Sequence, residues 1–87
     1  MSLHKKSALT KRLDDLIKRK ATGTLRELAS KFNVSISTMQ RYLDEFKEEF
    51  AAPVAFDRVH STYYYTEPFE LILTIEVHVN GEQKKII

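Results

Sequence analysis

The sequence predicts one small α+β domain in which three helices precede a β-hairpin and a longer C-terminal strand or hairpin. Three observations indicate this: the chain has 87 residues without Cys or Trp, its apolar residues recur at helical spacing as far as residue 50, and beyond Pro53 they alternate with polar ones. A chain of this length buries one modest core and has no room for a large substrate cavity. We therefore expect a binding module and not an enzyme.

The first helix is predicted over residues 7–20, after a flexible N-terminus at residues 1–6. Its apolar stripe consists of Leu9, Leu13, Leu16 and Ile17. The basic residues 18–20 complement the negative end of the helix dipole. Gly23 is expected to end the helix.

The second and third helices are each marked by a capping residue. Thr24 and Glu27 form a capping box. The apolar stripe that follows is Leu25, Leu28, Ala29 and Phe32. Asn33 then suits a left-handed turn, and Ser35 caps the third helix. This helix buries Met39, Tyr42, Leu43, Phe46 and Phe50, and its opposite face carries Ser37, Gln40, Arg41 and Asp44.

Period-two alternation predicts a short hairpin after Pro53, with its turn near His60. Its core side is expected to hold Val54, Phe56, Tyr63 and Tyr65, with only Tyr64 pointing outward. We therefore interpret the tyrosines as core aromatics and not as a platform for stacked bases.

A longer strand is predicted from Phe69 to Val79, followed by the hairpin signal Asn80-Gly81 and a returning strand at 82–87. An exposed apolar edge of this kind invites pairing with another chain. We therefore consider a homodimer formed through this strand. The alternative is that the strand packs on the core of its own domain.

Charge divides the chain into a basic and an acidic half. Residues 1–43 hold ten Lys or Arg and three Asp or Glu, whereas residues 44–87 hold four and nine. The basic half is therefore the expected face for a polyanion. The three histidines lack the spacing of metal ligands, and no nucleophile, base and pocket converge, so we expect neither metal nor catalysis.

Residues 24–43 have the spacing of a helix-turn-helix, with a small residue at Ala29, a turn at Asn33 and an apolar anchor at Met39. The chain resembles the winged helix-turn-helix family, particularly DeoR-type modules and those at the start of WYL-domain bacterial regulators. The matching segments are LRELASKFNVSISTMQRYLDEF and, as the wing, PVAFDRVHSTYYY. The resemblance covers residues 7–69, and residues 70–87 extend the same domain.

The family more usually has Gly where this chain has Asn33. No effector or oligomerisation domain follows the wing, so regulation by a small-molecule ligand is not expected. The resemblance implies that the third helix enters the DNA major groove and that the wing contacts the adjacent backbone or minor groove. By position, it implies DNA contacts from Ser35, Ser37, Thr38, Gln40 and Arg41 on the helix and from Arg58 and His60 on the wing.

The chemistry of these side chains suits the same role. Gln can bond bidentately to adenine, Arg to guanine, and Ser or Thr to phosphate. Lys11 and Lys18 are expected to bind phosphates in any sequence. The acidic residues that end the third helix are interpreted as a solvated surface.

We expect a cytoplasmic protein that binds double-stranded DNA sequence-specifically and regulates transcription, without a cofactor. The lack of Cys favours a reducing compartment, and no apolar stretch is long enough to span a bilayer. The alternative is a winged-helix module that binds another protein without direct contact with DNA bases. Its working surface would be the C-terminal edge and the acidic half of the chain.

Overall fold

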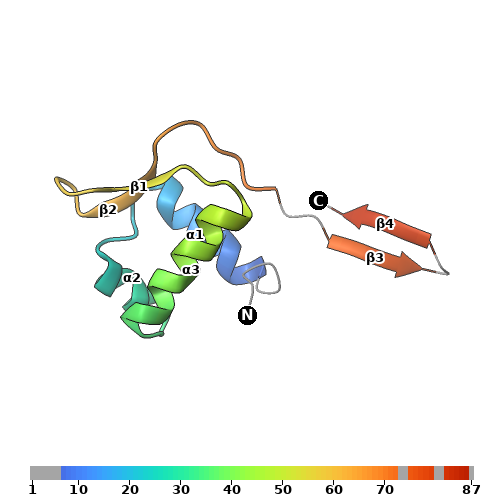
Figure 1. The fold of residues 1–87 in the computed structure, drawn as a ribbon, viewed down its shortest axis with the longest axis horizontal. Coiled ribbons are helices and arrows are strands. Elements are labelled where there is room, and N and C mark those ends of the chain that lie inside the picture. The colour runs from blue at the N-terminus through green and yellow to red at the C-terminus, as the bar shows by residue number, and fades with distance from the viewer. Residues whose placement is uncertain (1–6, 73–74, 80–81, 87) are drawn as a thin grey trace.

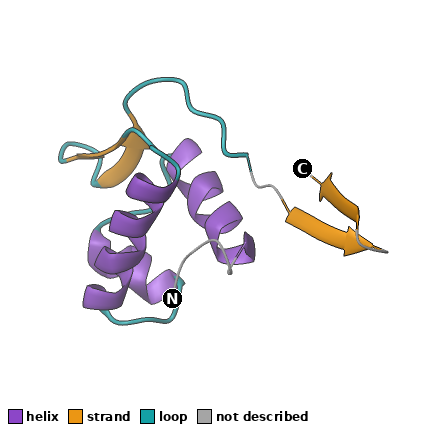
Figure 2. Ribbon diagram, turned by 45° about the vertical axis from the view of Figure 1, so that its right-hand side comes forward, coloured by secondary structure: helices purple, strands orange, loops and turns teal. Residues whose placement is uncertain are grey.

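The computed structural model describes residues 7–72, 75–79 and 82–86. These residues form an α+β structure of three helices followed by two antiparallel hairpins, which confirms the predicted class (Figures 1 and 2). The residues predicted to form a flexible N-terminus, 1–6, lie outside the described ranges. The elements are α1 (Ser7–Lys18), α2 (Leu25–Lys31), α3 (Ile36–Glu49), β1 (Val54–Asp57), β2 (Thr62–Tyr65), β3 (Ile75–Val79) and β4 (Glu82–Ile86).

The end of α1 differs from the prediction, because Lys20 and not Gly23 makes the terminating turn. Lys20 has a φ of 54°, and the amide N–H groups of Lys20 and Ala21 donate to carbonyls within α1. This is the hydrogen-bond pattern of a Schellman motif. Gly23 has a φ of 71° and lies beside α2, where a Cβ would approach Glu27 Oε1 to 2.9 Å. Glycine is therefore required there by α2 and not by α1.

The connection from α2 to α3 confirms the predicted caps and turn. Thr24 N donates to Glu27 Oε1 at 2.9 Å and Glu27 N to Thr24 Oγ1 at 3.2 Å, which completes the capping box. Asn33 is left-handed, with a φ of 55°. Ser35 Oγ accepts from Thr38 N at 3.1 Å and so caps α3.

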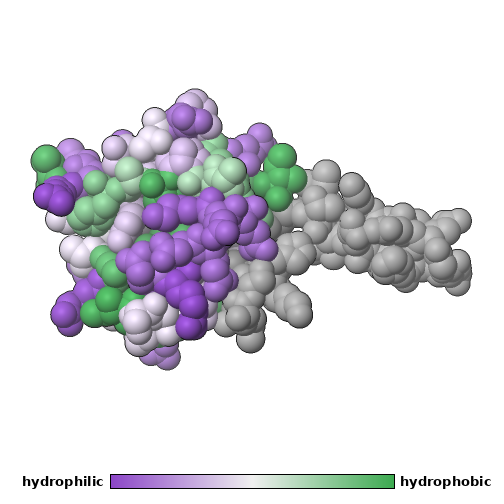
Figure 3. Space-filling model, viewed as in Figure 1, coloured by the Kyte–Doolittle hydropathy of each residue, from purple (hydrophilic) through white to green (hydrophobic). Residues whose placement is uncertain are grey.

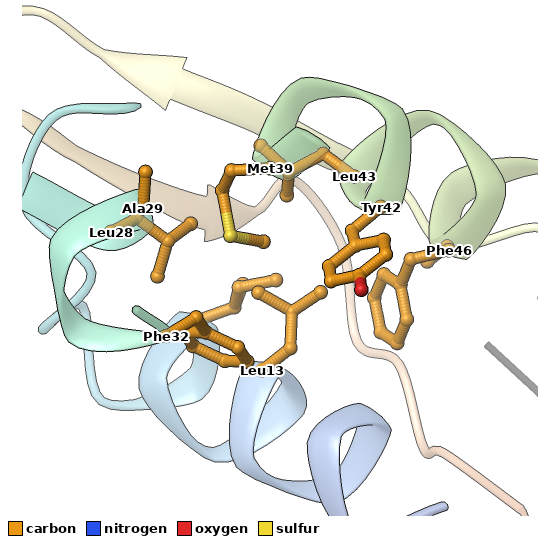
Figure 4. Close-up of a cluster of buried hydrophobic side chains, with 10 residues drawn as sticks. Leu13, Leu28, Ala29, Phe32, Met39, Tyr42, Leu43 and Phe46 are labelled. Carbon is orange, nitrogen blue, oxygen red and sulfur yellow. The ribbon is translucent and has the colours of Figure 1, made fainter. Parts of the chain in front are cut away.

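The helices bury one core that contains almost all of the predicted stripe residues (Figure 4). In Figure 4, Leu13 rises from α1 towards Met39 and Tyr42 of α3. Since α3 is held by a full apolar stripe, its opposite side is left to solvent. The buried residues are Leu13, Ile17, Leu28, Ala29, Phe32, Met39, Tyr42, Leu43, Phe46 and Ala52, with Leu9, Leu16, Leu25 and Phe50 partly buried around them.

Strand β2 is attached to α1 and to the loop after it by buried polar groups. Thr22 and Thr62 are 0% and 2% exposed, and their hydroxyl oxygens lie 3.0 Å apart. Tyr63 N also donates to Thr22 Oγ1 at 2.8 Å. Tyr65 donates its hydroxyl to Asp14 Oδ1 on α1 at 2.6 Å. These bonds fix the β1–β2 hairpin on the helices.

The aromatic residues of the β1–β2 hairpin follow the predicted alternation with one difference. Tyr63 and Tyr65 pack against the core as predicted. Phe56 pairs with Tyr63, with ring centroids 4.9 Å apart, but it remains 38% exposed. Tyr64 is half-buried. The prediction that Phe56 lies in the core is therefore wrong, because its ring covers Tyr63 at the edge of the domain.

The C-terminal strand is shorter than predicted. Residues 66–72 form no strand, because Phe69 packs its ring against Tyr65 at 4.8 Å and Phe46 at 6.3 Å between centroids. β3 pairs with β4 from Ile75 opposite Ile86 to Val79 opposite Glu82, and the predicted turn residues, 80–81, lie outside the described ranges. In both views this hairpin lies apart from the helices (Figures 1 and 2).

Candidate nucleic-acid interface

The largest group of predicted site residues lies on the exposed side of α3. Ser37, Gln40 and Arg41 are exposed, opposite the stripe that α3 buries. Their spacing of three and four residues places them on one face over two helical turns. Hydrophilic side chains cover the region of α3 in the face shown in Figure 3. The structure therefore brings these three predicted residues together on one accessible surface.

The start of α3 groups three hydroxyls. Ser35 Oγ caps the helix and also lies 2.9 Å from Thr38 Oγ1 and 3.3 Å from Ser37 Oγ. Ser35 and Ser37 are exposed and Thr38 is half-buried. Because Ser35 is occupied with the cap, Ser37 is the better placed of the two serines to contact a ligand. The amide N–H groups of this first turn also point outward along the helix axis, where anions bind.

Gln40 and Arg41 each face a carboxylate one turn further along α3. Gln40 Nε2 donates to Asp44 Oδ1 at 3.0 Å, and Arg41 Nε lies 4.0 Å from Glu45 Oε1. The prediction of the site did not include these carboxylates, although their i+4 spacing is visible in the sequence. The second half of α3 is strongly acidic, with Asp44, Glu45, Glu48 and Glu49 around Lys47.

The β1–β2 loop holds the other two residues predicted at the tip of the hairpin, Arg58 and His60, and both are exposed. Asp57 fixes this loop, since its carboxylate accepts from His60 Nδ1 at 2.7 Å and from Val59 N at 2.9 Å. The side-chain hydrogen bond from His60 lowers the pKa of Asp57, with smaller help from the backbone amides. The loop therefore presents Arg58 from a backbone held by hydrogen bonds.

Lys11 and Lys18 lie on α1, away from the exposed side of α3, because α1 turns its apolar stripe towards α3. Lys18 Nζ is 3.4 Å from Asp14 Oδ2, on the carboxylate that also binds Tyr65. Lys18 therefore has a structural partner. The structure does not bring these two lysines together with Gln40 and Arg41.

Three further cations have positions that sequence reasoning did not identify. Arg12 places its guanidinium carbon 4.9 Å from the ring centroid of Phe32, beside the turn between α2 and α3. Arg26 is exposed on the first turn of α2. Lys31 is occupied instead, because its Nζ donates to Ala21 O at 2.7 Å and Thr22 O at 3.1 Å. The sequence indicated only the general basic character of residues 1–43 and did not predict the individual contacts of these three side chains.

Within the described ranges, no three His, Asp or Glu side chains come together as a metal site, and no helix is long and apolar enough to cross a membrane. Comparison with protein-family models, with curated proteins and with solved structures gives no match.

Proposed function

We propose that the chain is a winged helix-turn-helix domain that binds double-stranded DNA sequence-specifically through α3 and regulates transcription. The observation that supports this most is the exposed face of α3, where Ser37, Gln40 and Arg41 lie together on a helix capped by Ser35. A helix of about 10–12 Å diameter fits the major groove, which is about 12 Å wide.

The proposed contacts divide into base and backbone contacts. Gln40 would bond to adenine and Arg41 to guanine, through the amide and guanidinium groups that the contacts with Asp44 and Glu45 leave free. Ser37 and the first amides of α3 would bind phosphate. Arg58, on the loop fixed by Asp57, would contact the adjacent backbone as the wing. The acidic second half of α3 would repel phosphates, so the first two turns enter the groove.

A second candidate function is protein binding, and the pairing of Gln40 and Arg41 with carboxylates favours it. Each of the two proposed base-contacting residues already has a partner within α3. The exposed apolar residues Phe56 and Val59, at 38% and 86% exposure, would add contact area. This candidate predicts weak DNA binding with little salt dependence.

The test is fluorescence anisotropy with mixed-sequence duplex DNA over a salt series, for the protein and its Q40A/R41A variant. A log–log salt slope steeper than about −3 with weakened binding by the variant would support DNA binding through α3. Arg19→Ala is the control for the loss of one paired cation, because Arg19 pairs with Asp15 at the same i,i+4 spacing but lies at the end of α1. It should weaken binding to all sequences slightly, as Lys11→Ala does, and by less than the α3 variant. Absence of binding at low salt would refute the proposal and favour protein binding.

Arg41 and Lys11 should behave differently if the assignment is correct. Arg41→Ala should relax the base preference at one position, whereas Lys11→Ala should weaken binding to all sequences alike. A uniform loss of affinity from Arg41→Ala would contradict its contact with a base. The measurement is competition against a set of duplexes that differ at single positions.

We also propose that two copies associate through the β3–β4 hairpin. As a two-stranded sheet, the described hairpin leaves an unpaired edge on each strand. A dimer would present two α3 helices to half-sites on DNA and raise affinity by linking two weak contacts. Light scattering at tens of micromolar tests this, and a monomer at that concentration would refute it.

A further inference from the structure

The contact between Gln40 and Asp44 fixes the orientation of an amide that is otherwise free to turn over. Gln40 Nε2 lies 3.0 Å from Asp44 Oδ1. Because a carboxylate only accepts hydrogen bonds, the atom of Gln40 that faces it must be the nitrogen. A primary amide has two N–H groups, so one N–H and Oε1 stay free for another partner.

Asp44 also lies near a cation on the next turn of α3. Lys47 Nζ lies 4.0 Å from the same Oδ1 atom, with 43% of the Lys47 side chain and 60% of the Asp44 side chain exposed. All three residues lie on the outer side of α3, at i, i+4 and i+7. The ammonium offsets part of the repulsion between the carboxylate and nearby phosphates. Asp44 can therefore remain beside Gln40 at a DNA surface.

We propose that Asp44 is a positioning residue that orients Gln40 to recognise adenine, an inference that rests on the proposed function. In the major groove, adenine offers N7 as an acceptor and its N6 amino group as a donor. The free N–H and Oε1 of Gln40 supply the complementary pair. An amide that turns freely presents this pair only part of the time, so Asp44 increases the preference for adenine without touching the base.

A direct base contact from Asp44 is the competing interpretation, since a carboxylate can accept from the N4 amino group of cytosine. The two interpretations differ in their dependence on Gln40. If Asp44 acts through Gln40, its removal has no effect once Gln40 is Ala. If Asp44 contacts cytosine itself, its removal abolishes a cytosine preference whether or not Gln40 is present.

The first experiment selects bound sequences from a randomised duplex pool for the wild type, D44A, D44N, Q40A and D44A/Q40A. Wild-type protein should prefer adenine at one position by roughly 5- to 150-fold, the range of a bidentate contact. D44A should reduce this preference about two- to fivefold, as for loss of one exposed hydrogen bond. D44N keeps an acceptor oxygen and should retain the preference, and D44A/Q40A should match Q40A.

Glu48→Gln is the control for charge. It removes one carboxylate from the same helix, about 12 Å along the axis from Gln40, so it changes the electrostatics without reaching the amide. D44N and E48Q should both increase affinity for mixed-sequence DNA, and E48Q should leave the adenine preference at its wild-type value.

The outcomes separate this inference from the proposed function. If wild-type protein fails to bind duplex DNA, both are wrong. If it binds with a steep salt slope but D44A keeps the full adenine preference, or D44A and E48Q reduce it equally, only the role of Asp44 is refuted. NMR of the free protein adds a direct test: one Gln40 Nε2 proton should shift downfield in wild type and D44N but not in D44A, and an unchanged spectrum in D44A would overturn the assignment.

Discussion

Replacing Tyr65 by Phe removes one hydroxyl and should loosen the attachment of β2 to α1. The hydroxyl donates to Asp14 Oδ1 at 2.6 Å, and only 8% of Asp14 is exposed. A hydrogen bond to a charged group contributes about 1.5–3 kcal/mol to stability. Lys18 remains 3.4 Å from the other carboxylate oxygen, so the loss should fall in the lower half of that range. We expect about 1.5–2 kcal/mol, or a fall in Tm of roughly 6–16 °C.

The assay is urea and thermal unfolding followed by circular dichroism, with Tyr64→Phe as the control. Tyr64 precedes Tyr65 in β2 and points to the other face of the strand, so loss of its hydroxyl should change the free energy of unfolding by less than about 0.5 kcal/mol. Equal losses from the two variants, or a Tyr65→Phe variant as stable as the wild type, would refute the assigned bond.

The same bond gives a pH signature. Burial, and then the hydrogen bond to Asp14, raise the pKa of Tyr65 above its ordinary value of 10.0. The folded state thus holds this proton more tightly than the unfolded state does, so the stabilisation is complete below pH 10.0 and is lost as the pH rises above it. Tyr65→Phe should show a smaller alkaline loss, with a remainder from Tyr63, whose pKa burial also raises.

Three further predictions concern the loop before α2 and the β1–β2 loop. Thr22→Val should destabilise the protein by about 1–3 kcal/mol in urea unfolding, because it leaves buried polar partners unpaired, and a loss below about 0.5 kcal/mol would contradict this. Gly23→Ala should cost about 1–2 kcal/mol in thermal unfolding, since its φ is 71° and the new Cβ meets Glu27; an unchanged Tm would disprove the strain. The side-chain hydrogen bond from His60 holds the pKa of Asp57 below its ordinary 3.8, so the stabilisation is present above that pH and is lost as the pH falls through the lower folded value. An NMR titration midpoint at or above 3.8 would contradict this assignment.

The elements that the sequence predicted well depend on contacts between near neighbours. Thr24 and Glu27 bond across three residues, Ser35 caps an amide three residues on, and Asn33 follows the C-cap residue of α2. These interactions depend on side chains and backbone within one turn, so a short stretch of sequence contains the necessary information. The exposed face of α3 was predictable for the same reason, because helical periodicity separates it from the buried stripe.

The incorrect predictions involve side-chain packing that residue type and alternation do not indicate. Gly23 is the better left-handed residue by type, but the approach of Glu27 assigns it to α2, and Lys20 takes the turn that ends α1. Alternation from Phe69 predicted a strand, yet the Phe69 ring packs against Tyr65, which is close in sequence, and against Phe46 of α3, which is distant in sequence. In both cases the packing of a side chain overrides the preference that residue type or alternation indicates.

The position of the α1 lysines determines which variant tests phosphate binding cleanly. Lys18 contacts the carboxylate that receives the Tyr65 hydroxyl, so Lys18→Ala would alter the attachment of β2 together with the surface charge. A loss of DNA affinity in that variant would therefore have two causes. Among the residues that the structure describes, none forms an ion pair or hydrogen bond with the Lys11 side chain, so its replacement changes the charge of α1. Lys11→Ala should thus weaken DNA binding with an unchanged free energy of unfolding, whereas Lys18→Ala should change both.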